Sequence, residues 1–271
     1  MAVKDYHRPT EIQAAAELVH AGAVPLMLSP RPPLEIEAES VVDLSQLGLS
    51  YIREEEDGLH IGALTPLQEI AASATVQARA NGILSQAAEL SAHLGLRHIA
   101  TLGGALYSND GPPEVSLALY VLNARVSFLD VAQEETTLAT WQEKPAGRVP
   151  IAVHLPTAHL RVGGALERIA RSPRDAAIVA VAATVTRKGN RTPNIRLAVG
   201  HNPSIQVDIT HSDEPVTSAD QITASLGELL HFKDHAQSDY AASAEYRHAM
   251  TKILTQRAIE RAFAASTTNN Q

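Results

Sequence analysis

Two adjacent glycines, Gly103 and Gly104, follow Thr101 and Leu102 in an otherwise apolar run, and this pair constrains the fold more than any other feature. A pair of glycines costs conformational entropy in any regular element, so the position requires bare backbone. Backbone N–H groups without a neighbouring Cβ are what a phosphate or pyrophosphate ligand uses. A tight turn or a close approach of two chain segments is the other interpretation. We therefore expect either a phosphate-binding loop or a tightly packed turn here.

Composition narrows the chemistry that this chain can carry out. Its 271 residues are enough for one to three compact domains, and 45% of them are hydrophobic. Acidic residues outnumber basic ones by 30 to 22, and the net charge of -8 argues against nucleic acid as a partner. The absence of cysteine excludes disulfides, a cysteine nucleophile and cysteine-held iron–sulfur clusters. A redox role would therefore need a bound organic cofactor.

Neither a targeting segment nor a metal site is expected from the sequence. The N-terminal residues lack the continuous apolar stretch of a secretory signal, and no run approaches the roughly 18 apolar residues of a membrane span. His231 and His235 would share one face of a helix, but no glutamate follows the first histidine as in a metalloprotease motif. We expect a cytoplasmic protein with no membrane span and no metal.

The distribution of apolar and turn-forming residues predicts mixed helices and strands in the first part of the chain. A helix is expected over residues 10–21, with Thr10 as its cap and Gly22 as its stop. Residues 49–53 and 59–63 are expected to form a hairpin around Glu56-Asp57-Gly58. Further helices are expected at 65–72, 87–94 and 115–122, and further strands at 24–28, 41–44, 124–129 and 149–155.

After residue 156 the pattern of apolar and turn-forming residues changes. Residues 166–169, 177–186 and 194–199 are expected to form a mixture of helix and strand, separated by turns. Residues 220–230 and 243–264 are expected to be helical, and the second of these helices is long and amphipathic. Residues 266–271 are polar and are expected to form a disordered tail.

Several segments along almost the whole chain match one known family in the same order. They are Tyr6-x-Arg8-Pro9, Ile61-Gly62-Ala63-Leu64-Thr65, Arg97-x-x-Ala100-Thr101-Leu102-Gly103-Gly104, Pro112-Pro113-Glu114, the run from Leu117 to Ala124, and Ser243-Ala244-Glu245-Tyr246-Arg247. In these segments the chain resembles the FAD-binding medium subunit of molybdenum hydroxylases, a group that includes carbon monoxide dehydrogenase and the xanthine dehydrogenase flavin domain. Each motif alone is weak, and their shared order makes the resemblance specific.

The resemblance implies an α+β fold. It implies a two-subdomain FAD-binding fold of the vanillyl-alcohol-oxidase/PCMH type, followed by a C-terminal α+β domain with a small antiparallel sheet and helices. Residues 1–56 would form an N-terminal α/β FAD subdomain and residues 57–160 a second one. Residues 161–265 would form the C-terminal domain, and residues 266–271 the tail.

The resemblance also implies which residues bind FAD. Ala100, Thr101, Leu102, Gly103 and Gly104 correspond to one of the family's two glycine-rich loops around the pyrophosphate, where small residues let N–H groups approach the phosphates. Glu114 corresponds approximately to an acidic position near the ribityl chain. Arg171 corresponds to a basic position that would lie near the flavin edge, although a surface ion pair is an equally good interpretation. No catalytic residue is expected in this chain.

The other glycine-rich loop departs from the family pattern. Where the family has an A-G-G motif, the chain has Leu28-Ser29-Pro30-Arg31-Pro32-Pro33-Leu34, so that Ser29 is the nearest candidate contact. Proline has no N–H group, and three prolines remove three potential phosphate contacts. Two hypotheses follow. Either the chain binds FAD through its remaining loop, or it keeps the fold as a flavin-poor or flavin-free structural or assembly subunit.

Partners are implied by the same resemblance. Substrate oxidation would occur at a molybdenum cofactor on a large subunit, and electrons would pass through iron–sulfur clusters on a small subunit. The FAD of this chain would then deliver them to an external acceptor. The lack of cysteine agrees with this division of labour, because this chain cannot hold cysteine-ligated clusters itself.

Overall fold

The computed structural model divides the chain into two compact units, and each is described by itself. Unit 1 comprises Met1–Ile70, Leu94–Pro112 and Asn123–Thr157, and unit 2 comprises Ala71–His93, Pro113–Leu122 and Ala158–Gln271. Within them the structure describes residues 3–26, 38–107, 113–129, 135–138, 148–157, 161–172, 175–187, 194–200, 204–209 and 238–268. The units cut across the boundaries expected at residues 56 and 160, and the division into three domains stays a prediction.

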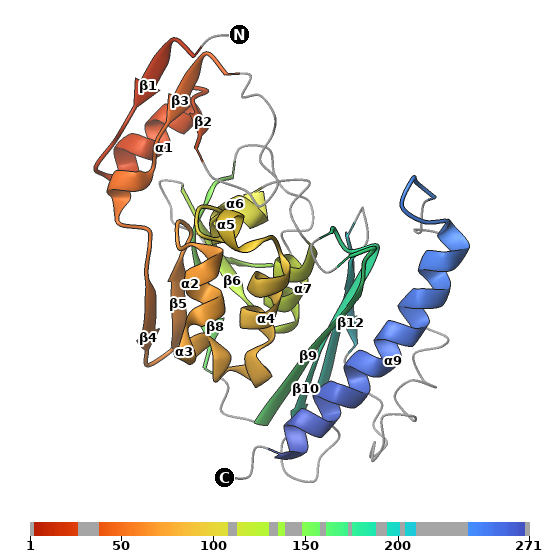
Figure 1. Cartoon of the computed structure of the whole chain (residues 1–271). Coiled ribbons are helices and arrows are strands. Elements are labelled where there is room, and N and C mark those ends of the chain that lie inside the picture. The colour runs from red at the N-terminus through yellow and green to blue at the C-terminus, as the bar shows by residue number, and fades with distance from the viewer. Residues whose placement is uncertain are drawn as a thin grey trace. The chain divides into compact units, whose positions relative to one another are not determined.

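A small parallel sheet with one helix begins unit 1 (Figure 1). Its strands β1 (Asp5–His7), β3 (Ser40–Val42) and β2 (Val24–Pro25) lie in that order, and α1 (Ile12–His20) precedes β2. The helix ends at His20 with Ala21 as its C-cap, and Gly22 follows with a φ of 98°, as expected for its stop. Thr10 is not the cap, because Glu11 occupies that position without a side-chain cap hydrogen bond.

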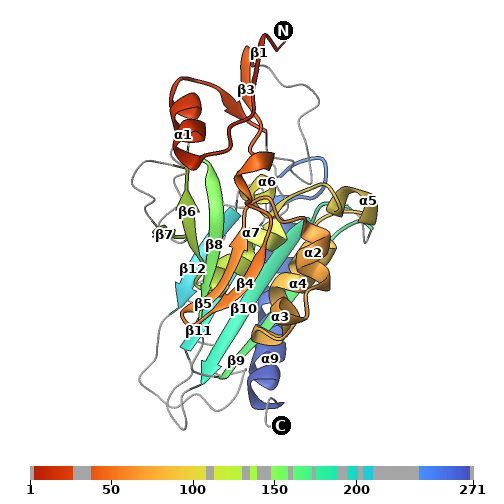
Figure 2. The ribbon, with the colours of Figure 1, turned by 90° about the vertical axis from the view of Figure 1, so that its left-hand side faces the viewer.

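A five-stranded antiparallel sheet forms the rest of unit 1 (Figure 2). Its order is β4 (Ile52–Glu55), β5 (Gly58–Gly62), β8 (Pro150–Pro156), β6 (Arg125–Phe128) and β7 (Glu135–Thr137). The expected hairpin is confirmed, because β4 and β5 pair around a turn at residues 56–57. The short helices α5 (Leu94–Arg97) and α6 (Leu102–Tyr107) also belong to this unit, whereas α2 (Leu67–Ala72) begins in unit 1 and ends in unit 2.

The two sheets of unit 1 share one apolar core. Small side chains on α1 allow close packing, because Ala15 and Ala16 are almost fully buried. The cluster continues through strand β3 and the ends of β6 and β8: Ala15, Ala16, Ala23, Val42, Leu44, Leu49, Leu129, Val149 and Ile151. The buried members of this cluster are all aliphatic, in keeping with the low aromatic content of 4%, and Tyr107 packs against them.

Unit 2 is built on a four-stranded antiparallel sheet. The order is β12 (Ser204–Ile209), β11 (Asn194–Gly200), β10 (Val179–Arg187) and β9 (Arg161–Ile169). Its described helices are α3 (Ala74–Gln77), α4 (Ile83–Leu90), α7 (Pro113–Val121) and the long α9 (Ala244–Thr268). Among the described residues, no helix is both long enough and apolar enough to cross a membrane.

The sheet of unit 2 is covered on both faces. One face packs on α9, which runs along β9 and β10 in Figure 1, through Val179, Val181, Ala183, Val185, Leu254, Ala258 and Ile259. On the other face, Thr184 of β10 donates a hydrogen bond to Val121 O of α7 at 2.8 Å. Because both faces are buried, β10 is apolar without alternation, and its sequence does not distinguish strand from helix. The mixture expected for residues 166–199 was wrong, because all three segments are strands.

Helix α9 is anchored by a buried arginine from the Ser243–Arg247 motif. The guanidinium of Arg247 donates to Ile178 O and to Asp239 Oδ1, both at 2.6 Å, and only 3% of the residue is exposed. The motif therefore joins the start of α9 to the residue that precedes β10.

The end of α9 differs from the expectation. The helix continues to Thr268, beyond the point where the polar tail was expected to begin, and Ser266 is buried.

Candidate functional site

The glycine-rich segment of unit 1 is joined to the Ile61–Thr65 segment by its backbone. Both had been singled out as separate motifs, and the structure brings them together. Two hydrogen bonds connect them, from Leu102 N–H to Thr65 O at 3.0 Å and from Gly103 N–H to Ala63 O at 2.7 Å. A third runs from Leu67 N–H, two residues after the Ile61–Thr65 segment, to Ala100 O at 2.9 Å. The two motifs therefore form one structural element.

Thr101 begins helix α6 and caps it. Its Oγ1 accepts a hydrogen bond from Gly104 N–H at 3.1 Å, and its carbonyl accepts one from Ala105 N–H at 3.0 Å. Residues 101–106 are all buried. The N–H groups of Gly103 and Gly104 thus already have acceptors within the chain. They would donate to a phosphate only by leaving Ala63 O and Thr101 Oγ1.

The Ile61–Thr65 segment has its own packing requirements. A Cβ on Gly62 would collide with the backbone oxygen of Leu49 and would lie 2.8 Å from Cε1 of Tyr51. The Thr65 hydroxyl donates to Tyr51 O at 2.9 Å and accepts from Tyr51 N–H at 3.0 Å. Gly62 and Thr65 therefore allow the Ile61–Thr65 segment to pack closely on the backbone of Leu49 and Tyr51.

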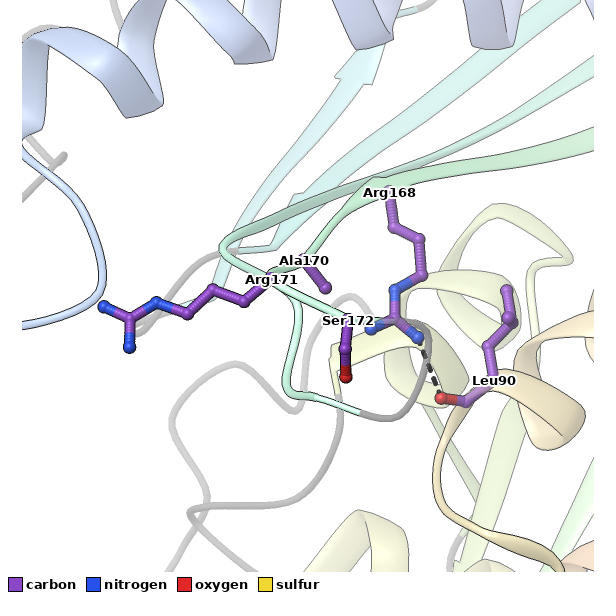
Figure 3. Close-up of a pocket in the computed structure, with 5 residues that line it drawn as sticks. All are labelled: Leu90, Arg168, Ala170, Arg171 and Ser172. Atoms are coloured by element: carbon purple, nitrogen blue, oxygen red, sulfur yellow. Dashed lines mark hydrogen bonds between the residues drawn. The ribbon is translucent and has the colours of Figure 1, made fainter.

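Unit 2 contains a cavity of about 300 Å³ beside the end of β9 (Figure 3). It is lined by Leu90, Arg168, Ala170, Arg171 and Ser172. Leu90 and Ala170 provide apolar surface, Ser172 a hydroxyl, and Arg168 a cation. These residues form an open depression with both apolar and polar walls.

Arg168 is held in place by three different partners. Its Nε lies 3.3 Å from Glu114 Oε1, Nη1 donates to Leu90 O at 3.0 Å, and Nη2 donates to Asp175 O. Glu114, at the start of α7, is only 1% exposed. The carboxylate for which the family resemblance implies a place near the ribityl chain is the ion-pair partner of Arg168 in this structure.

Arg171 takes a different direction from Arg168. In Figure 3 its guanidinium points away from Leu90 and Arg168. It donates to Tyr240 O at 2.6 Å and lies 5.6 Å from the centre of the Tyr240 ring. Sequence reasoning singled out Arg171 and missed Arg168. Alternation along β9 is the signal for Arg168, because residues 164 and 168 lie on the same face of the strand. Gly164 on that face packs against Ile83, whereas Gly163 on the opposite face packs against α9.

The opening motif of the chain forms a polar cluster on the small sheet. Tyr6 donates its hydroxyl hydrogen bond to Asp43 Oδ2 at 2.6 Å, and Arg8 Nε lies 3.2 Å from the same oxygen. Burial raises the pKa of Asp43, but hydrogen bonds from Tyr6 and Ser45 and the charge of Arg8 outweigh it, so the pKa lies below its ordinary value. The hydrogen bond to Asp43 raises the pKa of Tyr6. This motif fastens β1 to the end of β3.

The predicted cofactor residues thus fall into three groups. Ala100 to Gly104 lie in unit 1, and Glu114 and Arg171 lie in unit 2. Ser29 and the proline-rich segment lie outside the described residues, as do His231 and His235. The donor set of the cavity, a guanidinium and a hydroxyl against an apolar wall, fits one portion of a dinucleotide such as FAD, whereas the glycine amides are committed to the chain itself.

Comparison with known proteins confirms the resemblance. Residues 2–157 match the family model described as the FAD binding domain in molybdopterin dehydrogenase. The carbon monoxide dehydrogenase medium chain of Afipia carboxidovorans is 27% identical over 291 residues, covering 96% of each chain. The glyceraldehyde dehydrogenase medium chain of Sulfolobus acidocaldarius is 21% identical over 236 residues, covering 83% of each.

Structural comparison confirms the α+β fold. A chain of carbon monoxide dehydrogenase from Hydrogenophaga pseudoflava superposes with a TM-score of 0.79 at 20% identity, covering 97% of this chain and 98% of that one. The family match extends over more than half of the 271 residues and includes both joined motifs of unit 1. The chain therefore belongs to the family of FAD-binding domains in molybdopterin dehydrogenases.

Proposed function

We propose that this chain is the flavoprotein subunit of a molybdenum hydroxylase-type oxidoreductase. In this role it passes electrons from the iron–sulfur clusters of a partner, through FAD, to an external acceptor. The observation that carries the proposal is the family match over residues 2–157, which includes the two motifs that the backbone joins in unit 1. When bound, FAD supplies the transfer of electrons between clusters and acceptor.

The residues of unit 2 support a polar contact with FAD. Glu114 neutralises Arg168 and fixes its guanidinium at the wall of the cavity, where Ser172 adds a hydroxyl. A fixed, partly neutralised cation suits a phosphate or a polar ring edge without requiring the side chain to become ordered on binding. Arg171 would contribute only after leaving Tyr240.

The residues of unit 1 support a steric role. Thr101 to Gly104 carry small side chains apart from Leu102, and the backbone of this segment is fixed by Ala63 and Thr65. Such a rigid segment would let a pyrophosphate approach the backbone closely. Donation from Gly103 and Gly104 requires an exchange of their present acceptors, which a charged ligand favours because its hydrogen bonds are stronger than neutral ones.

The proposed partners follow from what the chain lacks. It has no cysteine, so cysteine-ligated clusters would have to be on another subunit. We propose an iron–sulfur small subunit and a large subunit with the molybdenum cofactor. This chain resembles a carbon monoxide dehydrogenase medium chain over 96% of its length, and the name of that relative implies further chains in its enzyme.

Reconstitution tests this function. The FAD-loaded chain would be mixed anaerobically with the reduced iron–sulfur subunit of its proposed complex, and flavin absorbance would be followed. We expect the flavin bands to bleach and then to recover when an acceptor is added. A flavin that stays oxidised beside a tightly bound reduced partner would contradict the proposal.

A structural or assembly subunit is the second candidate. The observation that favours it is the commitment of the Gly103 and Gly104 amides to Ala63 O and Thr101 Oγ1. In that case the chain would associate with its partners equally well with and without FAD. Omitting FAD from the assembly distinguishes the two functions, because only the flavoprotein would lose electron transfer to the acceptor.

A further inference from the structure

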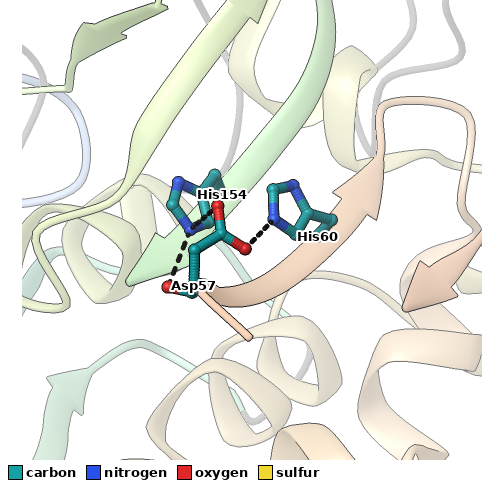
Figure 4. A group of neighbouring side chains, drawn as sticks. All are labelled: Asp57, His60 and His154. Carbon is teal, nitrogen blue, oxygen red and sulfur yellow. Dashed lines mark hydrogen bonds and ion pairs between the residues drawn. The ribbon is translucent and has the colours of Figure 1, made fainter. Parts of the chain in front are cut away.

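Three side chains that bind metals in many proteins meet on the five-stranded sheet of unit 1 (Figure 4). Asp57 lies in the turn between β4 and β5, His60 lies on β5, and His154 lies on β8. One ligand atom from each side chain lies within 4.8 Å of the other two. The family motifs do not include these residues, and the proposed function does not use them.

The pairing of the strands accounts for this cluster. His60 and His154 are direct partners in the antiparallel pairing of β5 and β8, so they lie on the same face. Their rings stack with centres 4.3 Å apart and planes 7° apart. Thr157 N–H donates to Asp57 O at 2.8 Å and fixes the turn against β8. The position of all three side chains is therefore set by the backbone.

Gly58 allows the turn to approach the histidines. It has a φ of 154°, and a Cβ there would lie 2.7 Å from His154 Nε2 and would collide with the oxygen of Leu155. With glycine at this position, the Asp57 carboxylate reaches both rings. Its Oδ1 lies 2.9 Å from His60 Nε2, and its Oδ2 lies 3.6 Å from His154 Nε2.

The charges around the cluster are mixed. Glu55 and Glu56, which precede Asp57, are exposed carboxylates. Arg53 pairs directly with His60 and Arg125 pairs directly with His154, so a basic residue lies beside each histidine on the same face of the sheet. The side chain of His154 is 7% exposed and that of Asp57 62%, so the cluster is closed on one side and open to solvent on the other.

We propose that Asp57, His60 and His154 bind a divalent transition-metal ion, with Zn²⁺ as the best match. Two imidazole nitrogens and one carboxylate oxygen are a donor set that Zn²⁺ accepts, with water completing four-fold coordination. The ion would hold the β4–β5 turn against β8. This inference does not depend on FAD, because all three residues belong to the sheet of unit 1.

Binding requires one ring to leave the stack. The lone pair of an imidazole nitrogen lies in the ring plane, so two parallel rings cannot direct both lone pairs at one ion. His60 is the ring that turns, because its side chain is 21% exposed whereas that of His154 is 7% exposed. In the present arrangement His60 Nε2 donates to Asp57 Oδ1 and His154 Nε2 donates to Asp57 O. Coordination through these atoms requires the hydrogen of each neutral ring to move to Nδ1.

Titration of the full chain without a polyhistidine tag tests the site. The protein would be treated with chelator, and Zn²⁺ binding would be followed by calorimetry and Co²⁺ binding by visible absorption, with and without FAD. We expect one ion per chain, and at least a roughly tenfold loss of affinity in His60→Gln, His154→Gln and Asp57→Asn.

Matched variants separate this site from general attraction of cations. Glu56→Gln removes the same charge as Asp57→Asn but no proposed ligand, and His98→Gln removes an exposed histidine elsewhere in unit 1. Both should bind Zn²⁺ as the wild type does. Since His154 is buried, its variant is informative only when circular dichroism shows a folded protein, and His60→Gln and Asp57→Asn carry the test. Wild-type affinity in both of these variants would overturn the proposal.

Discussion

Thr101–Gly104 and Glu114 are both predicted to contact FAD, but the structure holds them by different means. In unit 1 the segment is fixed by backbone hydrogen bonds to Ala63 and Thr65. In unit 2 a buried carboxylate is fixed by the guanidinium of Arg168. Small residues in the first motif thus permit close approach of the backbone, whereas the charged residue in the second forms a buried ion pair. Substitutions should therefore have unequal effects in the two regions.

Loss of the Glu114 charge should produce the largest effect. Glu114→Gln leaves the guanidinium of Arg168, which is 10% exposed in its side chain, without its anionic partner. Breaking a buried ion pair by removing one partner costs about 3 to 5 kcal/mol. We expect a loss of this size in the free energy of unfolding, measured by urea denaturation. Glu89→Gln, which changes an exposed glutamate of unit 2, should change it by less than about 0.5 kcal/mol.

A methyl group on Gly62 should produce the next largest effect. In Gly62→Ala the new Cβ would collide with the oxygen of Leu49, so the backbone beneath the glycine-rich segment must move. We expect a loss of about 3 kcal/mol in the free energy of unfolding. Gly48→Ala is the matched control: Gly48 has a φ of 67° but open space around its Cβ position, so only about 1 kcal/mol should be lost. Equal losses of free energy of unfolding in the two variants would show that the close approach of position 62 to Leu49 O does not determine the effect.

Sequence reasoning identified features that depend on local residue chemistry. The hairpin was predictable because Asp57-Gly58 is a turn sequence flanked by strand-forming residues, and the stop of α1 was predictable from Gly22. The glycine motif also revealed the family, since its order among other motifs is a property of the sequence alone.

Features that depend on distant partners were not predictable. Strand β10 is buried on both faces, so its apolar run carries no period that separates strand from helix. The role of Arg168 depends on Glu114 and Leu90, which come from other elements. Likewise, nothing near His60 in the sequence indicates that His154 stacks on it. Only tertiary pairing brings these residues together.

The cap of α6 should contribute a smaller amount than either change above. Thr101→Ala removes the oxygen that accepts from Gly104 N–H, and loss of a helix cap costs about 1 kcal/mol. Thr101→Ser keeps this oxygen and should lose much less. Urea denaturation of both variants measures the difference. If Thr101→Ala lost as much free energy of unfolding as Glu114→Gln, the two regions would not differ in how strongly a single side chain stabilises them.

The smallest expected effect is a pH dependence at Asp43. The pKa of Asp43 is lowered in the folded state, so its contribution to stability is present above the unfolded pKa of about 3.9 and is lost as the pH falls through the folded value. Urea midpoints of wild type and Asp43→Asn should therefore differ at neutral pH and converge in acid. Tyr6→Phe, which removes one hydrogen bond to this carboxylate, should give part of the same difference. A constant difference down to the lowest pH would contradict this role.

FAD content tests the proposed function most directly, because a flavoprotein subunit must retain bound flavin. The full chain would be purified, supplied with excess FAD, freed of unbound flavin by gel filtration, and compared by visible absorbance and protein concentration. We predict one FAD per chain, with retention reduced in Glu114→Gln more than in Thr101→Ser. A folded wild-type chain that stays colourless after exposure to FAD would contradict the claim that this protein is a flavoprotein.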